Sequence, residues 1–209
     1  MNELQTYINT YFNIGIDDLQ EVEKLFQVTH LSKNEFVCKE DTKCDSLSFI
    51  ISGHVRVFKY ENGKEITQWI SSPGEFITDL SSLVFNTNAR WNIQAISDCQ
   101  FYTITRTNYN KLNELLPTWP QLEKHFIAKC FLVLEDRVFS FLSLSSEERY
   151  NHLLNYKKEI FNQVPLNYLA SMLGMTPETL SRIRKKQISS ESNSNCCYFV
   201  LNQNNNKCH

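Results

Sequence analysis

The order of hydrophobic and polar residues divides the chain into segments of different texture. In residues 1–26 the apolar positions recur at helical spacing, and the acidic pair Asp17-Asp18 precedes the clearest set. That set consists of Leu19, Val22, Leu25 and Phe26. The pattern predicts a helical N-terminal segment.

Residues 28–105 consist of short β-branched and aromatic runs, which are typical of strands. The clearest runs are 47–52, 54–60, 65–70, 91–96 and 100–105. Asn62-Gly63, the strongest short hairpin signal, separates the second of these runs from the third. Gly53 and Pro73-Gly74 mark further turns. Several short strands at intervals of about ten residues predict a small barrel, roll or sandwich.

A long helix is predicted over residues 118–142, opened by Pro117 and Pro120. Large side chains recur along it with a mean spacing near 3.7 residues, at Trp119, Leu122, Phe126, Cys130, Val133, Arg137 and Phe141. Leu134 and Val138 widen the stripe, so one face can cover the β region while the remaining apolar surface meets a symmetry mate. We assign dimerisation to Phe126, Cys130, Val133, Arg137 and Phe141. The alternative is a helix that only covers its own domain.

Two segments of different character follow. Residues 146–160 form another predicted helix, with Ser146 as its N-cap and acidic residues in its first turn. Residues 188–209 are rich in Ser and Asn and are interpreted as a low-complexity tail. Within that tail, residues 196–201 (CCYFVL) could form one short strand.

Residues 164–186 carry the features of a helix-turn-helix. Two short helices that cross steeply need a small residue where their backbones approach, and Ala170 supplies it. The turn between them needs a residue that tolerates positive φ, and Gly174 follows four residues later. Apolar residues then close the corner, namely Leu169, Leu173 and Met175 from the first side and Leu180 and Ile183 from the second.

The second helix of this motif has a clear start and a polar surface. Thr176 is the predicted N-cap, Pro177 occupies the first helical position and Glu178 the first turn. Such a helix suits the major groove, where Arg182 could contact guanine and Glu178 could accept a hydrogen bond from cytosine. The full predicted DNA-binding set is Thr176, Glu178, Thr179, Ser181, Arg182, Arg184, Lys185 and Lys186, of which Thr179, Arg184, Lys185 and Lys186 are assigned to phosphates. The alternative is a helical hairpin with a solvated basic face.

Charge and composition add two constraints. The net charge is −2, but residues 1–144 carry 13 basic against 18 acidic residues, whereas residues 145–187 carry 7 against 4. A local basic segment on an acidic body fits a localised nucleic-acid contact. No apolar run of about 18 residues exists, and the N-terminus lacks the layout of a signal peptide. We therefore expect a cytoplasmic protein that does not enter a membrane.

The chain has seven cysteines without C-x-x-C spacing: Cys38, Cys44, Cys99, Cys130, Cys196, Cys197 and Cys208. In a cytosolic protein they would stay reduced and act as small buried hydrophobes. A thiol sensor or a metal site is the alternative. Motifs of hydrolases, P-loop proteins and zinc proteases are absent from the sequence, so we do not expect an enzyme.

The order of these segments resembles that of the Crp/Fnr family of bacterial transcription regulators, from about residue 5 to 187. Residues 72–80 (SPGEFITDL) resemble the family's P-G-[DE]-x-[IF]-G-E-L phosphate cassette, and residues 92–95 (NIQA) resemble the strand that follows it. The resemblance implies an α+β fold: an N-terminal β-roll (a double-stranded β-helix), a long dimerisation helix and a C-terminal helix-turn-helix. It further implies a homodimer that binds a palindromic operator in double-stranded DNA, with RNA polymerase as a further candidate partner.

Departures from the cassette argue against cyclic AMP as the effector. In members that bind it, the glutamate of G-E-L holds the ribose and a downstream arginine pairs with the cyclic phosphate. Here Thr78 replaces the glycine and the shorter Asp79 replaces the glutamate, while the arginine position falls on Ala89 with Arg90 one place along. A one-residue offset on a strand reverses the face of the side chain. Gly74, Asp79 and Arg90 are kept as a weak candidate effector site, with Asp79 expected at a turn or on the surface.

Other departures concern metal cofactors and DNA. The oxygen-sensing branch uses closely spaced N-terminal cysteines for an iron–sulfur cluster, whereas the first cysteine here is Cys38, so neither a cluster nor another metal is expected. Pro177 stands where the family usually has an arginine. The two-stranded wing that often follows the recognition helix is expected to be reduced or absent, because only residues 196–201 could supply it.

The expected domains are a β-roll sensor with its N-terminal helix (1–116), a dimerisation helix (117–143), a helix-turn-helix domain (144–187) and a tail (188–209). The leading hypothesis is a homodimeric, sequence-specific transcription regulator whose effector is not cyclic AMP. The alternative is a cyclic-nucleotide-responsive sensor that uses the partial cassette at 72–80.

Overall fold

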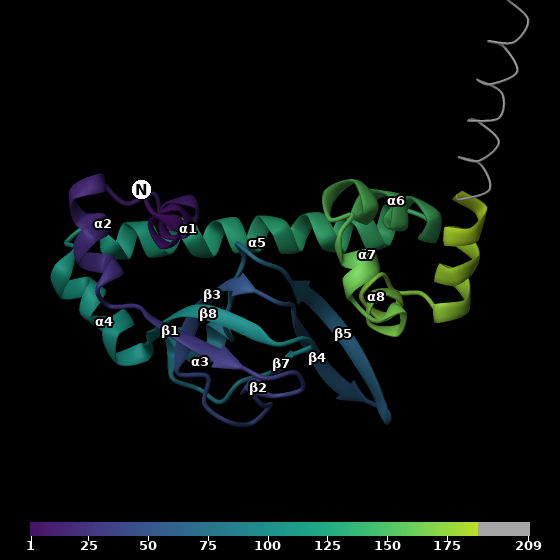
Figure 1. The fold of residues 1–209 in the computed structure, drawn as a ribbon, viewed down its shortest axis with the longest axis horizontal. Helices are drawn as coiled ribbons and strands as arrows, with labels where there is room; N and C mark the ends of the chain where they lie inside the picture. The colour runs from purple at the N-terminus through teal and green to yellow at the C-terminus, as the bar shows by residue number, and fades with distance from the viewer. Residues whose placement is uncertain (188–209) are drawn as a thin grey trace, which may run out of the picture. The chain divides into compact units, whose positions relative to one another are not determined.

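The computed structural model describes residues 1–187 and divides the chain into two compact units (Figure 1). The first unit spans Met1–Ser143, and the second begins at Leu144. Residues 196–201, the predicted strand of the tail, and Cys196, Cys197 and Cys208 lie outside the described residues.

The N-terminal segment forms two helices instead of one continuous helix. α1 (Glu3–Phe12) begins with a capping box in which Asn2 and Gln5 exchange hydrogen bonds. It ends at Asn13, whose left-handed backbone (φ 53°) closes the helix. α2 (Ile16–Glu23) then starts after Gly15. The sequence therefore predicted the helical character correctly but missed the break.

Within residues 1–187, eight strands form two antiparallel four-stranded sheets (Figure 1). Their bounds are β1 Gln27–Leu31, β2 Phe36–Cys38, β3 Ser46–Ser52, β4 Val55–Glu61, β5 Lys64–Ser71, β6 Phe76–Ile77, β7 Asn92–Ala95 and β8 Cys99–Thr105. One sheet has the order β1-β8-β3-β6 and the other β2-β7-β4-β5. Buried side chains of both sheets form a common core, which includes Ile50 and Phe101 from the first and Val55 and Ile93 from the second. This arrangement confirms the predicted β-roll.

The turn between β4 and β5 is the predicted tight hairpin. Glu61 pairs with Lys64, which leaves Asn62 and Gly63 as the two connecting residues. Both have positive φ, 51° and 72°, as a type I′ turn requires. A bulge between Val57 and Phe58 shifts the register further along this hairpin.

Several short elements of the roll were not predicted. They are β1, β2 and β6, the helix α3 (Leu80–Phe85) and the helix α4 (Arg106–Leu115). β6 has only two residues, and β2 has three with an irregular register against β7. Tertiary pairing decides the conformation of such segments, because a few residues carry too little periodicity to identify a strand.

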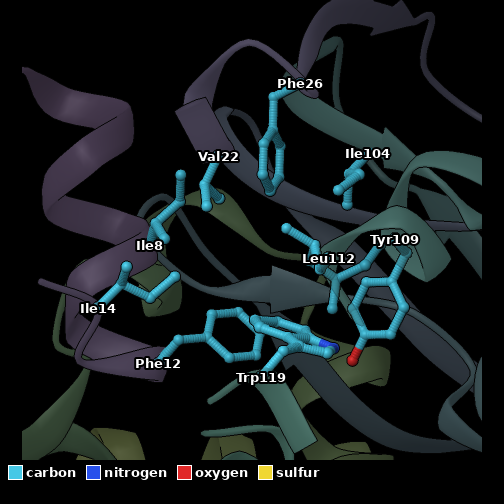
Figure 2. A pocket seen from close by; sticks show the side chains of 10 residues that line it. Ile8, Phe12, Ile14, Val22, Phe26, Ile104, Tyr109, Leu112 and Trp119 are labelled. Atoms are coloured by element: carbon cyan, nitrogen blue, oxygen red, sulfur yellow. The ribbon is translucent and has the colours of Figure 1, made fainter. Parts of the chain in front are cut away.

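A second core lies where the helices of the first unit meet the roll. α1 contacts α2 and α5 (Trp119–Ser143), and α4 contacts α5 and β8. The rings of Phe12 and Phe126 lie 4.7 Å apart and those of Phe12 and Trp119 4.9 Å apart. The side chains in Figure 2 surround an apolar cavity of about 10 Å³ between these elements. This space is no larger than one water molecule and cannot hold an effector.

The second unit is helical within the described residues. α6 (Ser146–Tyr156) is followed by α7 (Ile160–Gln163), α8 (Leu166–Met172) and a further helix over residues 177–187. Ser145, and not Ser146, is the N-cap of α6, because it forms a capping box with Glu148. The helix also ends at Tyr156 and not at residue 160, since Lys157 leaves helical geometry (φ −142°).

Within residues 1–187, no helix is both long enough and apolar enough to cross a membrane.

Candidate nucleic-acid interface and sensor site

The corner between α8 and the helix over 177–187 is built as the sequence predicted. Ala170 is fully buried, and its carbonyl accepts a hydrogen bond from the N–H of Met175 at 3.0 Å. Gly174 has φ 65° at the turn, a conformation that a side chain would strain. Leu180 and Ile183 of the second helix are buried, as is Leu169 of the first. These contacts fix the angle at which the second helix leaves the turn.

The second helix starts at a cap of hydroxyl groups. The Oγ1 of Thr176 accepts a hydrogen bond from the N–H of Thr179 at 3.2 Å. Glu178 is fully exposed, and hydrogen bonds from its own backbone N–H and from the Thr176 hydroxyl lower the pKa of its carboxyl. The first turn therefore keeps a negative charge at the positive end of the helix.

The predicted DNA-binding residues divide into an exposed stripe and its flanks. Glu178, Arg182 and Lys185 are exposed, and their spacing of four and three residues places them on one face. Thr176 at the cap and Lys186 beside the stripe are also exposed. The half-buried residues are Thr179, Ser181 and Arg184. Seven residues separate Lys185 from Glu178, so the stripe follows the helix for about two turns.

Two of the basic residues assigned to phosphates differ from this stripe. The Nζ of Lys186 lies 3.0 Å from a carboxylate oxygen of Glu147, at the start of α6. Arg184 is half-buried and lies on the side of Leu180, towards the core of the helix-turn-helix. The side chain of Lys186 is therefore more accessible to solvent than that of Arg184.

Arg149 of α6 braces the turn of the helix-turn-helix, a role that the sequence interpretation missed. Its Nε donates to the carbonyl of Leu173 at 3.0 Å and its Nη1 to the carbonyl of Leu144 at 2.6 Å. Carbonyls at helix ends lack partners inside the helix, so this guanidinium satisfies one beside Gly174. The sequence around Arg149 indicates only an amphipathic helix. Its role could not be predicted, because the carbonyl of Leu173 lies 24 residues further along the chain.

The cassette-like segment 72–80 bends tightly against β3. The N–H of Gly74 donates to the carbonyl of Ile50 at 2.9 Å, and Gly74 has φ 85°. The N–H of Ile50 donates in turn to the carbonyl of Glu75 at 2.9 Å. Glu75 also turns its carboxylate back to the N–H of Ser72 at 3.1 Å. These bonds hold the segment closed on the roll.

Asp79 lies just before α3 and is buried, so of the two expected positions, at a turn or on the surface, the surface one is wrong. Its carboxylate caps α3 by accepting from the N–H of Ser82 at 2.9 Å, and it accepts from the hydroxyl of Ser81 at 2.6 Å. The other carboxylate oxygen accepts from the backbone N–H of Arg90 at 2.7 Å. Both carboxylate oxygens therefore already accept hydrogen bonds from the protein itself, so Asp79 is poorly placed to bind a ribose hydroxyl.

The positions downstream of the cassette lie on opposite sides of the wall of the roll. Ala89 is buried in the core between the sheets, whereas the side chain of Arg90 is exposed. The N–H of Ala89 donates to the carbonyl of Thr42 at 2.7 Å, and the N–H of Asp41 donates back to the carbonyl of Ala89 at 2.9 Å. The position that resembles the phosphate-binding arginine is thus occupied by a methyl group inside the roll.

The long helix α5 turns most of the predicted dimerisation residues towards its own unit. Phe126 is fully buried in the core with Phe12 and Phe76, so it cannot contact a partner chain. Cys130 packs against the same core. The guanidinium of Arg137 lies 5.3 Å from the ring of Trp69 in β5, and burial lowers its pKa to about 10. The assignment of Phe126 is therefore wrong, because the broad apolar face did not reveal which half the roll covers.

A different stripe of α5 remains exposed in the described chain. Its members recur every three to four residues, with exposed fractions from 38% to 80%: Ile127, Phe131, Leu134, Val138 and Leu142. The centre of the stripe lies about a third of a turn from the buried Phe126 side. An apolar row of this length on one helix face is typical of a helix–helix contact. We refer to these five residues as the α5 stripe.

Among residues 1–187, no group of three or more His, Cys, Asp or Glu side chains is arranged to hold a metal ion.

Comparison with known proteins identifies this architecture. Residues 28–114 match the cyclic nucleotide-binding domain family. The catabolite activator protein of Thermus thermophilus is 20% identical to the chain, with a TM-score of 0.53 and 87% of each chain covered. The chain has the Crp/Fnr fold.

Two further structures share the Crp/Fnr fold with this chain. FixK2 from Bradyrhizobium japonicum is 18% identical, with a TM-score of 0.64, 79% of this chain covered and 86% of the other. The c-di-GMP responsive global regulator CLP of Xanthomonas campestris is 17% identical, with a TM-score of 0.63 and coverages of 85% and 93%. No curated protein matches the sequence. At these identities the Crp/Fnr structures establish the fold, and the roles of individual residues rest on the geometry above.

Proposed function

We propose that this chain is a homodimeric, sequence-specific DNA-binding transcription regulator whose effector is not cyclic AMP. The observation that carries the proposal is the exposed Glu178-Arg182-Lys185 stripe on a helix fixed by the buried Ala170–Leu180 corner. A rigid corner presents such a helix to the major groove at a defined angle, and its first residues then meet base edges. Arg182 reads guanine, and Glu178 accepts from cytosine.

The fold supports this proposal, because a β-roll, a long helix and a helix-turn-helix follow one another along the chain. The Thermus protein is named a catabolite activator and the Xanthomonas protein a global regulator of gene expression, which is the class of function proposed here. The α5 stripe supports a homodimer, because a two-fold axis would bury the same residues from both chains. A symmetric dimer with two recognition helices reads a palindromic operator.

Selection of DNA from a random-sequence pool by the full-length protein tests the proposed function. We expect an enriched motif with two inverted half-sites whose centres lie about one helical turn apart. Each half-site should contain a guanine at a fixed position, as the target of Arg182. Retention of DNA without any enriched motif would indicate only non-specific, salt-sensitive binding and would contradict the proposal.

The exclusion of cyclic AMP rests on the cassette. The Asp79 carboxylate is engaged by three donors, and Ala89 places a methyl group where the phosphate would need a cation. Isothermal titration of the full-length protein with cyclic AMP and cyclic GMP should therefore give no binding heat up to millimolar ligand. A saturable heat with either nucleotide would instead support the cyclic-nucleotide-responsive alternative.

A further inference from the structure

Two side chains of α6 contact opposite ends of the helix over residues 177–187. A carboxylate oxygen of Glu147 lies 3.0 Å from the Nζ of Lys186, near the end of this helix. The Nε of Arg149 donates at 3.0 Å to the carbonyl of Leu173, in the turn that precedes the helix. Both contacts lie inside the second unit, so they constrain the direction of the helix relative to α6.

The two contacts of α6 differ in strength. The side chains of Lys186 and Glu147 are 69% and 42% exposed, and an ion pair in contact with water contributes little to a fixed geometry. Arg149 is half-buried, and its cationic N–H groups donate to backbone carbonyls. Hydrogen bonds from a charged donor are shorter and stronger than neutral ones. The direction of the helix therefore depends mainly on Arg149.

Arg149 joins two separate points of the backbone. Its Nε bonds the carbonyl of Leu173, the residue that ends α8. Its Nη1 donates at 2.6 Å to the carbonyl of Leu144, the first residue of the second unit, which follows the end of α5 at Ser143. The Nη2 lies 3.4 Å from the hydroxyl of Ser146. One guanidinium thus links the start of the second unit to the turn of the helix-turn-helix.

The shape of the guanidinium is what makes this link specific to arginine. Its N–H groups lie in one rigid plane and point in fixed directions, so they can hold the carbonyls of Leu144 and Leu173 at the same time. A lysine at this position would keep the positive charge, but its ammonium is a single point on a flexible stem. The carbonyl of Leu173, at a helix end, would then lose a fixed partner.

A small change in the direction of the helix becomes a large displacement at Arg182. Arg182 stands five residues after Pro177, which corresponds to about 7.5 Å along the helix axis. A tilt of about 10° at the turn moves the chain by about 1.3 Å over that length. Side chains that bind a partner specifically must be held within about 0.5 Å of their productive position. A bidentate contact from Arg182 to guanine therefore requires a fixed turn.

We propose that Arg149 is a positioning residue for base reading by Arg182. It acts by holding the turn of the helix-turn-helix against the start of the second unit, because its guanidinium is directed to the carbonyls of Leu173 and Leu144. The inference rests on the function proposed above and adds to it a residue outside the helix that enters the groove. Loss of this link lowers the preference for the operator more than it lowers non-specific affinity.

Arg149→Lys in the full-length protein tests this role without removing a positive charge. In a mobility shift we expect at least about fivefold weaker binding to the selected operator, because part of the contact to guanine is lost. Binding to a scrambled duplex should change by less than about twofold, since it depends on charge. Arg149→Gln should weaken operator binding at least as much. Equal losses of Arg149→Lys on both duplexes, or unfolding of both variants at room temperature, would overturn the proposal.

Phe161→Leu is the matched control for a general loss of stability. Phe161 is buried in the same unit, and its ring lies 5.1 Å from that of Tyr150, the neighbour of Arg149 in α6. The smaller side chain should lower the thermal stability but leave the hydrogen bonds of Arg149 in place. We expect its ratio of operator to scrambled-duplex affinity to stay within about twofold of the wild type. A ratio lowered as much as in Arg149→Lys would contradict a positioning role.

A double-mutant cycle with Arg182→Ala shows whether Arg149 acts through Arg182. Operator affinity is measured for the wild type, Arg149→Lys, Arg182→Ala and the double variant. We expect the loss caused by Arg149→Lys to be at least about threefold smaller in the Arg182→Ala background. Equal losses in both backgrounds would overturn the proposal and leave the proposed function intact. If Arg182→Ala alone had no effect on operator affinity, base reading by Arg182 would itself be wrong, and the positioning role would fall with it.

Discussion

Replacing Arg182 by alanine is expected to weaken binding to the selected operator by about 30-fold or more, with little effect on non-specific DNA. A bidentate contact to guanine discriminates by about 1–3 kcal/mol, and a dimer makes the contact twice. Two contacts at the low end give about 2 kcal/mol, which corresponds to about 30-fold in affinity. Because Arg182 is exposed, the fold should be unaffected.

The measurement is a mobility shift over a salt series with the operator and a scrambled duplex. Lys186→Ala serves as the basic control, because Lys186 lies beside the stripe and pairs with Glu147. Removal of one phosphate-binding lysine from each protomer of the dimer should weaken both duplexes alike and reduce the salt slope by about two. If Arg182→Ala also weakened both duplexes equally, Arg182 would bind a phosphate and the base-reading assignment would be wrong.

Replacing Phe131 by glutamate is expected to convert the dimer into monomers and to abolish binding to a two-half-site operator. Phe131 is 60% exposed in the middle of the α5 stripe, so the charge is harmless to the monomer. In a symmetric dimer it would place two carboxylates in an apolar contact, which costs several kcal/mol. We expect the dimer dissociation constant to rise by at least about 100-fold, which corresponds to roughly 2.7 kcal/mol.

Phe139→Glu is the matched control for this prediction. It makes the same substitution on the same helix, at a residue that is 68% exposed but lies about a quarter turn from the centre of the α5 stripe. Analytical ultracentrifugation of the two variants should give a monomer for Phe131→Glu and a dimer for Phe139→Glu. Dimers from both variants, or monomers only from Phe139→Glu, would place the interface elsewhere.

The helix-turn-helix could be predicted from sequence because its determinants are local. Ala170, Gly174 and Thr176 act on neighbours within a few residues, and the structure gives them the buried, left-handed and capping geometry that the spacing indicated. The one-residue error at Ser145 arose because two serines stand in succession before the acidic turn. Only the reach of the Glu148 side chain distinguishes them.

The faces of α5 could not be assigned from sequence for a different reason. Apolar residues surround much of this helix, so its periodicity permits more than one buried side. The aromatic packing of Phe126 with Phe12 and Phe76 decides the matter, and both partners come from distant segments. The α5 stripe can be identified as the exposed face only once the buried face around Phe126 is known.

In the sensor domain, too, the sequence could not predict the surroundings of single residues. The departures at Thr78, Asp79 and Ala89 were visible in the sequence. The buried hydrogen bond that the Asp79 carboxylate accepts was not, because its donor is the N–H of Arg90, eleven residues away.

Base reading by the helix over 177–187 is tested most directly by combining a DNA change with a protein change. Guanine at the fixed half-site position is replaced by 7-deazaguanine, which removes the N7 acceptor, and affinities are measured for the wild type and for Arg182→Ala. We expect about a fivefold loss of affinity for the wild type when one half-site is changed, at the low end of what one such contact contributes, and no further loss for the variant. Equal losses of affinity in both proteins would contradict base reading by Arg182.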